Sequence, residues 1–218
     1  MAKSAKFAGE RRRRDLSLEE IVRVALGILG SEGEAALTMR RLADACGVTP
    51  MAIYHHVTDK AALLELAVNQ VVLDALPGRT ASPLPWREEL VRTVSAFRNA
   101  LVDNPGAGRV FVRQAVVGSG TAAVTEIMLR LLNEAGLTGD AVVEAADSLT
   151  LVVLGSVVNE LTRPPAVRER LIGHLAESET PFLVQHLPAY AHRDPEKRFL
   201  RALGWLIDGF ERDRDTGG

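Results

Sequence analysis

The sequence has few of the residues that build disulfide-stabilised, secreted or membrane-spanning proteins. Only one of its 218 residues is cysteine, Cys46, which excludes an internal disulfide framework and indicates a reducing cytosol. Residues 1–14 contain no apolar segment of the kind that a secretory signal needs, so we expect no such signal. The longest apolar stretch without a charge, residues 148–159, is shorter than the roughly 20 residues that span a bilayer. It predicts a buried helix and no membrane contact.

Patterns typical of catalysis and of metal binding are also scarce. The glycine pairs within 106–108 and 118–120 follow no predicted strand, and no Walker lysine accompanies them. Adjacent His55 and His56 would point in different directions on a helix, with no third ligand at metal-binding spacing. Three further histidines stand in a proline-containing region without a nucleophile or a carboxylate set: His174, His186 and His192. We therefore predict no enzyme activity, no cofactor and no metal site.

The composition favours helices. Alanine, leucine, valine, arginine and glutamate dominate, aromatic residues make up 5%, and neither a β pattern nor an internal repeat is present. The fold class that we predict is therefore all-α. Charge is unevenly distributed, because residues 1–60 carry 10 Lys and Arg against 8 Asp and Glu although the whole chain has a net charge of −2. A positive N-terminal part suits contact with phosphate groups.

The segment 37–57 is the most informative part of the chain, because it predicts two short helices joined by a tight turn. Gly47 stands at the turn, where a residue with positive φ closes the first helix. Thr49 can cap the second helix and Pro50 can occupy its first position, where a missing N–H costs nothing. Ile53 then points inward, which leaves polar and aromatic neighbours on the outer face. This pattern is typical of a helix-turn-helix, whose second helix lies in a DNA groove.

Helical periodicity continues on both sides of this motif. Ser17 and Glu20 form a capping box that starts a helix ending near Gly33. Thr38 is expected to cap the next helix, and Thr58 the fourth, which runs to residue 76. Further helices are expected at 86–104, 109–117, 121–135, 140–161 and 167–176 and from Pro195 onward, with no element assigned to 177–194. The predicted domains are a basic arm (1–14), a helix-turn-helix head (15–60) and a larger helical body (61–218), joined by the helix at 58–76.

Four short motifs in and after the helix-turn-helix resemble those of the tetracycline-repressor (TetR) family of bacterial transcriptional regulators. They are LTMRRLA at 37–43, GVT at 47–49, IYHHV at 53–57 and KAALL at 60–64. A weaker resemblance to the C-terminal domain of that family is carried by residues 133–137, 154–158 and 207–211. The resemblance implies a homodimer with two DNA-binding heads, ligand pockets in the helical bodies, and release from an operator when a small molecule binds.

The resemblance also implies DNA contacts at matching positions. Arg40 is expected to contact a guanine edge, with contact to phosphate alone as the alternative. Base-edge or thymine-methyl contacts are expected from the helix that Pro50 opens, by Thr49, Met51, Ala52 and His55. Phosphate contacts are expected from Thr38, Tyr54, His56 and Lys60, and Arg41 is expected to contact phosphate or solvent. Pro50, at the start of the helix that carries Met51, is also a candidate DNA-binding residue. For the basic arm 1–14, insertion into the DNA and a solvated tail both stay open.

A four-helix dimer interface is expected on the helices 140–161 and 195–212, as in the family. The candidate interface residues are Ala145, Leu149, Gly155, Ser156, Phe199, Leu203, Leu206 and Phe210. The alternative is that these residues close the core of a single chain. A twofold dimer predicts a near-palindromic operator with half-sites about 34–36 Å apart.

A ligand pocket is expected between the helices that begin near residues 58, 86, 109 and 121, with the helix 140–161 behind it. Its candidate lining residues are Phe97, Phe111, Arg113, Gln114, Met128, Asn133, Asn159 and Glu160, although the aromatic ones could equally be core residues. The sequence departs here from tetracycline-binding members, because the stretch 104–117 contains no histidine and no set of ligands for a magnesium–drug chelate. A mostly apolar organic inducer is therefore expected.

The sequence thus predicts a ligand-responsive transcriptional repressor of the bacterial cytoplasm that binds an operator as a dimer. Two alternatives stay open. One is an activator, or a ligand-insensitive DNA-binding protein, with the same head. The other is a helical small-molecule-binding protein or enzyme whose helix-turn-helix pattern is accidental.

Overall fold

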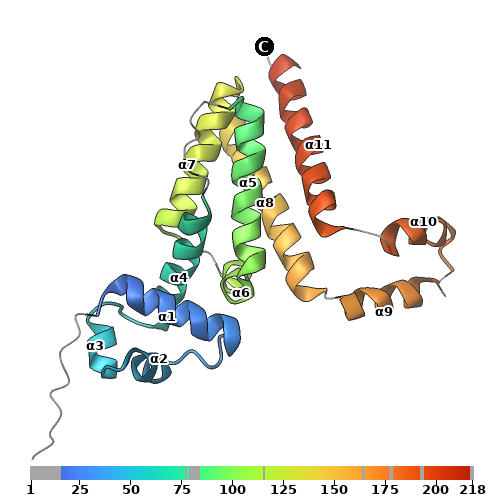
Figure 1. Ribbon diagram of the computed structural model, residues 1–218. Coiled ribbons are helices and arrows are strands. Elements are labelled where there is room, and N and C mark those ends of the chain that lie inside the picture. The colour runs from blue at the N-terminus through green and yellow to red at the C-terminus, as the bar shows by residue number, and fades with distance from the viewer. Residues whose placement is uncertain are drawn as a thin grey trace, which may run out of the picture.

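The computed structural model describes residues 16–76, 78, 84–114, 116–163, 165–176, 179–191 and 194–216. These residues form eleven α-helices and no strand (Figure 1), which confirms the all-α prediction. The basic arm 1–14 and His192 lie outside the described residues.

Three short helices form the head at one end of the molecule: α1 (Leu18–Ser31), α2 (Met39–Cys46) and α3 (Pro50–Tyr54). Their N-caps agree with the sequence prediction, because the side chains of Ser17, Thr38 and Thr49 accept hydrogen bonds from backbone N–H groups of the first turns. The turn between α2 and α3 is closed by Gly47 at φ 70°. Inward-facing side chains of all three helices, among them Ile53 at 0% exposure, share one apolar core.

The helix that leaves the head is α4 (Lys60–Ala75). Its N-cap residue is Asp59, so the prediction of Thr58 at this position is wrong. Asp59 has an extended backbone, and its Oδ1 accepts a hydrogen bond of 2.8 Å from the backbone N–H of Ala62. A carboxylate at this place also interacts favourably with the positive end of the helix dipole.

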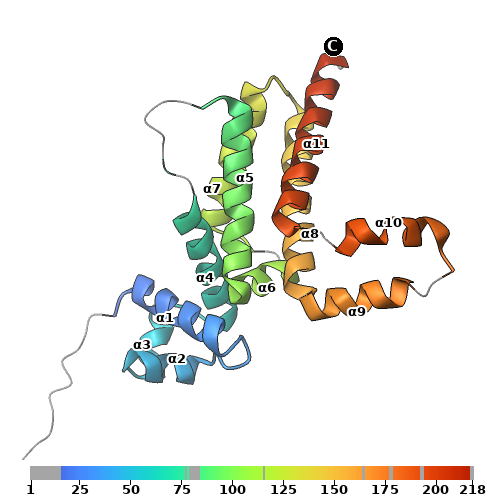
Figure 2. The same ribbon diagram turned by 45° about the vertical axis from the view of Figure 1, so that its right-hand side comes forward.

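The body contains α5 (Trp86–Asp103), α6 (Pro105–Arg113), α7 (Ser119–Glu134), α8 (Asp140–Thr162) and α11 (Pro195–Thr216). The long helices run alongside one another above the head, while the short α6 lies at the end of the body nearest to the head (Figures 1 and 2). Helix α4 packs against α5, α6 and α7, so the head and the body share one continuous apolar core.

Helix α6 begins at Pro105, four residues before the start expected from the sequence. The expectation treated Gly106 and Gly108 as helix breakers, whereas both lie inside the helix. A Cβ on Gly106 would meet Leu29 of α1 at 2.8–3.0 Å, and a Cβ on Gly108 would collide with the backbone of Leu101. These glycines therefore allow α6 to approach its neighbours closely, and Pro105 occupies a first-turn position that tolerates proline.

Helix α8 is long and apolar enough to cross a membrane by length and composition alone. In the structure it packs against α5, α6, α7 and α11, as a core helix does. It is less enclosed than the sequence suggested, because Val143 and Leu151 on its outer side are 55% and 66% exposed.

Two helices project sideways from the body as an arm (Figure 2): α9 (Pro165–Ala176) and α10 (Pro181–Ala191). They pack against each other. Helix α10 fills part of the stretch that the sequence left unassigned, and it contains Pro188 within its length. A proline inside a helix removes a backbone donor, which is why no helix was expected there.

Candidate nucleic-acid interface and ligand cavity

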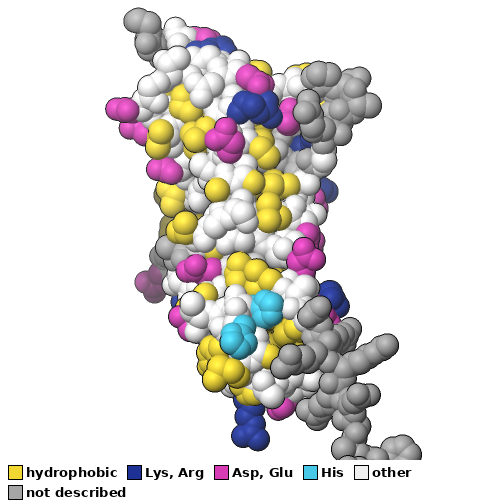
Figure 3. Space-filling model, turned by 90° about the vertical axis from the view of Figure 1, so that its left-hand side faces the viewer, with side chains coloured by type: hydrophobic (Ala, Val, Ile, Leu, Met, Phe, Trp, Pro, Cys, Tyr) yellow, Lys and Arg dark blue, Asp and Glu magenta, His cyan; other side chains and the backbone are white. Residues whose placement is uncertain are grey.

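The outer face of α3 is open to solvent. Met51 and Tyr54 are 67% and 47% exposed, Thr49, His55 and His56 are exposed, and Ala52 is half-buried. Figure 3 views the molecule from this side and shows histidine side chains next to hydrophobic ones on the head. Exposed apolar and aromatic groups on a five-residue helix contribute nothing to its core. They are suited to contact an external surface, such as the edges of bases in a groove.

Short-range contacts fix the direction of this face. The Thr49 hydroxyl accepts a hydrogen bond of 3.4 Å from the backbone N–H of Ala52. The N–H of Val48 donates to the carbonyl of Ala43 over 3.0 Å, which closes the turn after α2. Ile53 is buried beneath the helix. Because both ends of the turn are bonded and the underside is packed, the orientation of α3 relative to α2 is determined by this segment itself.

The three cations near α3 are not equivalent. Arg40 is exposed and forms no ion pair with any residue that the structure describes. The guanidinium of Arg41 is paired with the Glu32 carboxylate at 2.6 Å, and this hydrogen bond raises the pKa of Arg41. The ammonium of Lys60 donates to the backbone carbonyl of Glu34 over 2.7 Å. Of the three, Arg40 therefore has the side chain most available for a bidentate contact to a base.

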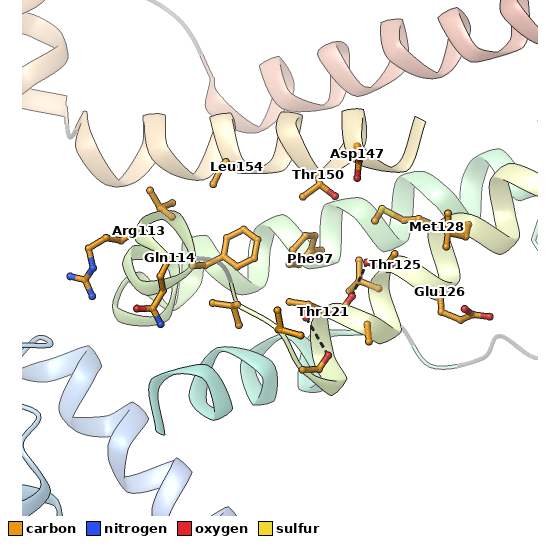
Figure 4. Close-up of a pocket in the computed structure, with 18 residues that line it drawn as sticks. Phe97, Arg113, Gln114, Thr121, Thr125, Glu126, Met128, Asp147, Thr150 and Leu154 are labelled. Carbon is orange, nitrogen blue, oxygen red and sulfur yellow. Dashed lines mark hydrogen bonds between the residues drawn. The ribbon is translucent and has the colours of Figure 1, made fainter. Parts of the chain in front are cut away.

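A cavity of about 710 Å³ lies in the body between α5, α6, α7 and α8 (Figure 4). Phe97 of α5 and Phe111 of α6 form its aromatic wall, with ring centroids 5.4 Å apart and planes at 85°. Exposed Val117, Thr125 and Glu126 also line it, so the cavity opens to the surface. Its volume and its mostly apolar walls suit a small organic ligand.

Five of the eight residues proposed from the sequence line this cavity: Phe97, Phe111, Arg113, Gln114 and Met128. The other three do not. Asn133 is exposed, and its Nδ2 donates to the Leu129 carbonyl of its own helix over 2.9 Å. Asn159 is half-buried but not among the lining residues, and Glu160 forms an ion pair with the buried Arg98 of α5. A buried arginine needs such a partner, which explains why Glu160 is turned away from the cavity.

Sequence reasoning missed several polar lining residues. Thr121 and Thr125 lie one turn apart on α7, and Asp147 and Thr150 lie on α8 with Leu154 following at helical spacing. Figure 4 shows Asp147 and Thr150 on the side of α8 that faces the cavity. The spacing of these residues was visible in the sequence. What could not be seen was that both stripes face the same space as Phe97.

Five of the proposed dimer residues are buried within the single chain: Ala145, Leu149, Phe199, Leu203 and Phe210. Their side chains belong to the core of the single chain, so little of their surface is open to a partner. Of the remaining three, Gly155 is exposed, Leu206 is half-buried, and the hydroxyl of Ser156 accepts a hydrogen bond of 2.8 Å from Arg98. The exposed apolar side chains of these two helices are instead Val143, Leu151, Leu200 and Trp205.

The cavity wall is linked to the head through Glu34, which lies between α1 and α2. Its carboxylate forms an ion pair with Arg113, a cavity residue at the end of α6, and its carbonyl accepts the Lys60 hydrogen bond. Close packing of Gly106 against Leu29 joins the same two helices, α6 and α1. Helix α6 is therefore in direct contact with the head.

Comparisons with known proteins agree with this architecture. The family model for bacterial regulatory proteins of the tetR family matches residues 21–67, and the model for the tetracyclin repressor-like C-terminal domain matches residues 81–214. The class E tetracycline repressor protein of Escherichia coli is 28% identical over 209 residues, which cover 92% of this chain and 93% of that protein.

Two solved structures of ActR from Streptomyces coelicolor share the fold. The apo structure has a TM-score of 0.83 at 24% identity and covers 94% of this chain and 99% of its own. The complex with actinorhodin has a TM-score of 0.79 at 25% identity and covers 90% and 95%. Since the family models together match most of the chain, this protein belongs to the TetR family of bacterial transcriptional regulators.

Proposed function

We propose that this chain is a ligand-responsive transcriptional repressor that binds operator DNA as a dimer and is released by a small organic inducer. The observation that carries the proposal is that Glu34 of the head contacts both Arg113, which lines the cavity, and Lys60, which begins the helix that follows α3. The similarity to tetracycline repressors and to ActR, whose structure contains actinorhodin, supports the same reading. Because operator DNA is its partner, we expect it in the bacterial cytoplasm. The head comprises residues 15–60, and 61–218 form the regulatory body.

The dimer interface lies on the exposed apolar side chains of α8 and α11. Leu151 is 66% exposed and Trp205 is 68% exposed, so both helices offer large apolar side chains that a partner could cover. Trp205 is suited to be an anchor of this interface, since tryptophan is enriched among the residues that dominate binding energy. A twofold axis through these helices presents two α3 helices to half-sites about one helical turn apart, about 34–36 Å.

The inducer is a mostly apolar organic molecule with an aromatic part. Phe97 and Phe111 offer ring faces and edges for stacking, and Asp147, Gln114 and the threonines offer polar contacts. Among the residues that the structure describes, no histidine lines this cavity. The described lining therefore lacks the histidine and glutamate set expected of tetracycline-binding members, so a tetracycline–metal inducer is not expected.

Ligand entry changes the position of α6, and α6 acts on the head through the Arg113–Glu34 pair and the Gly106–Leu29 contact. The two heads of the dimer then no longer fit successive grooves together. For this to release DNA, the inducer must prefer the non-binding state by about 1–3 kcal/mol or more. A Glu34→Gln variant should shift the inducer concentration needed for release. In the absence of inducer, its affinity for the operator should change less than about fivefold, because exposed ion pairs contribute about 1 kcal/mol or less.

Selection of bound duplexes from random DNA by the full chain tests the function directly. We expect a near-palindromic sequence with two half-sites, and binding that weakens as salt rises. Equal affinity for all duplexes at moderate salt would contradict the proposal. Placing the selected site upstream of, or overlapping, a reporter promoter then separates activation from repression.

A further inference from the structure

Asn69 of α4 is a polar side chain within the apolar core. It is only 4% exposed, and all of its hydrogen-bonding capacity is used. Its Nδ2 donates to the carbonyls of Glu65 (2.9 Å) and Val117 (3.4 Å). Its Oδ1 accepts from the backbone N–H groups of Gly120 (2.9 Å) and Thr121 (3.1 Å). A single amide therefore connects α4 to the segment that precedes α7 and to the first turn of α7.

This connection is the N-terminal cap of α7. The residue at the cap position, Gly118, has no side chain with which to accept a hydrogen bond. The first N–H groups of a helix need acceptors, and here Asn69 supplies one from a different helix, about fifty residues earlier in the chain. The start of α7 is consequently attached to α4.

The two glycines of this segment make the contact possible. A Cβ on Gly118 would lie well inside 3.0 Å of the Asn69 side chain, and a Cβ on Gly120 would lie equally close to the Asn69 backbone. The φ of Gly118 is 163°, an extended conformation that any residue adopts. Lack of space and not backbone strain therefore requires glycine here. The pair 118/120, which matches no phosphate-binding motif in the sequence, is explained by the approach of α4.

The segment attached to Asn69 is also a wall of the cavity. Val117, Gly118 and Thr121 all line it, and Asn69 contacts the backbone of Val117 and Thr121. Helix α4 in turn begins at Lys60, a few residues after α3, and Lys60 is bonded to the head. The path from cavity wall to α3 thus passes through one amide side chain and one helix.

We propose that Asn69 is a positioning residue that couples the ligand cavity to the DNA-binding head by attaching residues 117–121 to α4. This inference rests on the proposed function of a ligand-released repressor. When a ligand displaces the segment 117–121, the Asn69 bonds transmit the displacement to α4. Without these bonds, DNA and ligand each still bind, but the effect of one on the other is reduced to what the Arg113–Glu34 contact transmits. Coupling between two sites is a free energy separate from either affinity, so it can be lost alone.

The test uses covalent filling of the cavity, so that no natural inducer is needed. In a Cys46→Ala background, Thr125→Cys places one reactive thiol at the open side of the cavity, and pyrene maleimide fills it. Mass spectrometry reports complete labelling, and fluorescence anisotropy reports affinity for the selected operator before and after labelling. Asn69→Ala and Asn69→Asp are compared in this background. Gln70→Ala is the matched control, because within the described part of the chain its amide bonds to Asp74 of the same helix and to no residue of α7.

We expect labelling to weaken operator binding about 10-fold in the parent and in the Gln70→Ala variant. In Asn69→Ala labelling should weaken operator binding by about threefold or less, because only the Arg113–Glu34 contact still links cavity and head. In Asn69→Asp, which keeps the contacts to Gly120 and Thr121, the effect of labelling should be intermediate. The unlabelled proteins should bind operator within about threefold of the parent. Asn69→Asp keeps the two acceptor contacts to α7 but loses donation to Glu65 and Val117, so it removes the bond to the segment before α7 without removing the cap of α7. If either folded Asn69 variant loses as much operator affinity on labelling as the parent does, the proposal is overturned.

The remaining outcomes separate this inference from the proposed function. A parent without sequence preference contradicts DNA recognition itself. A parent that keeps its operator affinity after labelling contradicts release by ligand and the role of Asn69 together. If both Asn69 variants fail to fold by circular dichroism while Gln70→Ala folds, Asn69 serves stability and the coupling role is overturned.

Discussion

The DNA-facing surface and the ligand cavity are constructed in different ways. The outer face of α3 consists of residues within 49–56, positioned by a turn and caps a few residues away. The cavity is lined by residues from 97 to 154, contributed by four helices. The first site can therefore keep its shape through local contacts, whereas the second depends on how helices pack and can change when that packing changes. A regulator needs this combination of a constant reading surface and an adjustable sensor.

The inward and outward faces of α3 offer the sharpest test of this contrast. Ile53→Ala should lower the free energy of unfolding by about 2–5 kcal/mol, because Ile53 is fully buried and the removed atoms leave a cavity. Met51 lies on the exposed face of the same helix. Met51→Ala should therefore change the free energy of unfolding by about 0.5 kcal/mol or less. Urea unfolding followed by circular dichroism measures both. Similar losses in the two variants would show that α3 does not have separate structural and contact faces.

One substitution at the dimer face of the body should cost more free energy of association than one substitution at the DNA face of the head. Trp205→Asp should weaken dimerisation by about 2 kcal/mol or more, since a charge replaces an aromatic side chain that the proposed dimer would bury. Lys197→Ala on the same helix is the control, with little expected effect. Sedimentation equilibrium measures the dissociation constant. An unchanged dimer in the Trp205 variant would place the interface elsewhere.

Base recognition should depend on the exposed guanidinium of Arg40 more than on that of Arg41. Arg40→Ala should cost about 1–3 kcal/mol of operator affinity and relax the base preference at one position per half-site. Arg41→Ala should cost less, because its guanidinium is already paired with Glu32. Anisotropy titrations against single-base operator variants distinguish the two. Equal losses without any change of base preference would assign Arg40 to phosphate contact.

The smallest expected effect concerns Lys60, which stands between the two sites. Lys60→Ala should weaken binding to all DNA sequences alike and reduce the slope of affinity against salt by about one counterion. Titrations at several salt concentrations give this slope. If the slope is unchanged while affinity still falls, Lys60 acts only through its hydrogen bond to the Glu34 carbonyl.

Prediction from the sequence succeeded where a feature depends on neighbours in the chain. Thr38, Thr49 and Gly47 occupy the caps and the turn that their side chains or backbone favour. Prediction from the sequence failed where the packing of a residue depends on segments far away in the chain. Gly106 and Gly108 looked like helix ends but permit close packing of α6, and Leu149 and Phe199 looked like an interface but fill the core of one chain. Apolar periodicity identifies a buried face without telling which neighbour buries it.

The amino-acid sequence alone determined the helical class, the helix-turn-helix and the residues that α3 presents, because caps, glycine turns and helical spacing act over a few residues. Only the tertiary structure decided that Phe97, Asp147 and Thr121 face one cavity, and that Asn69 caps a helix about fifty residues away. Those relations arise from the packing of helices against one another, and the free energy of that packing is distributed over contacts that no local pattern records.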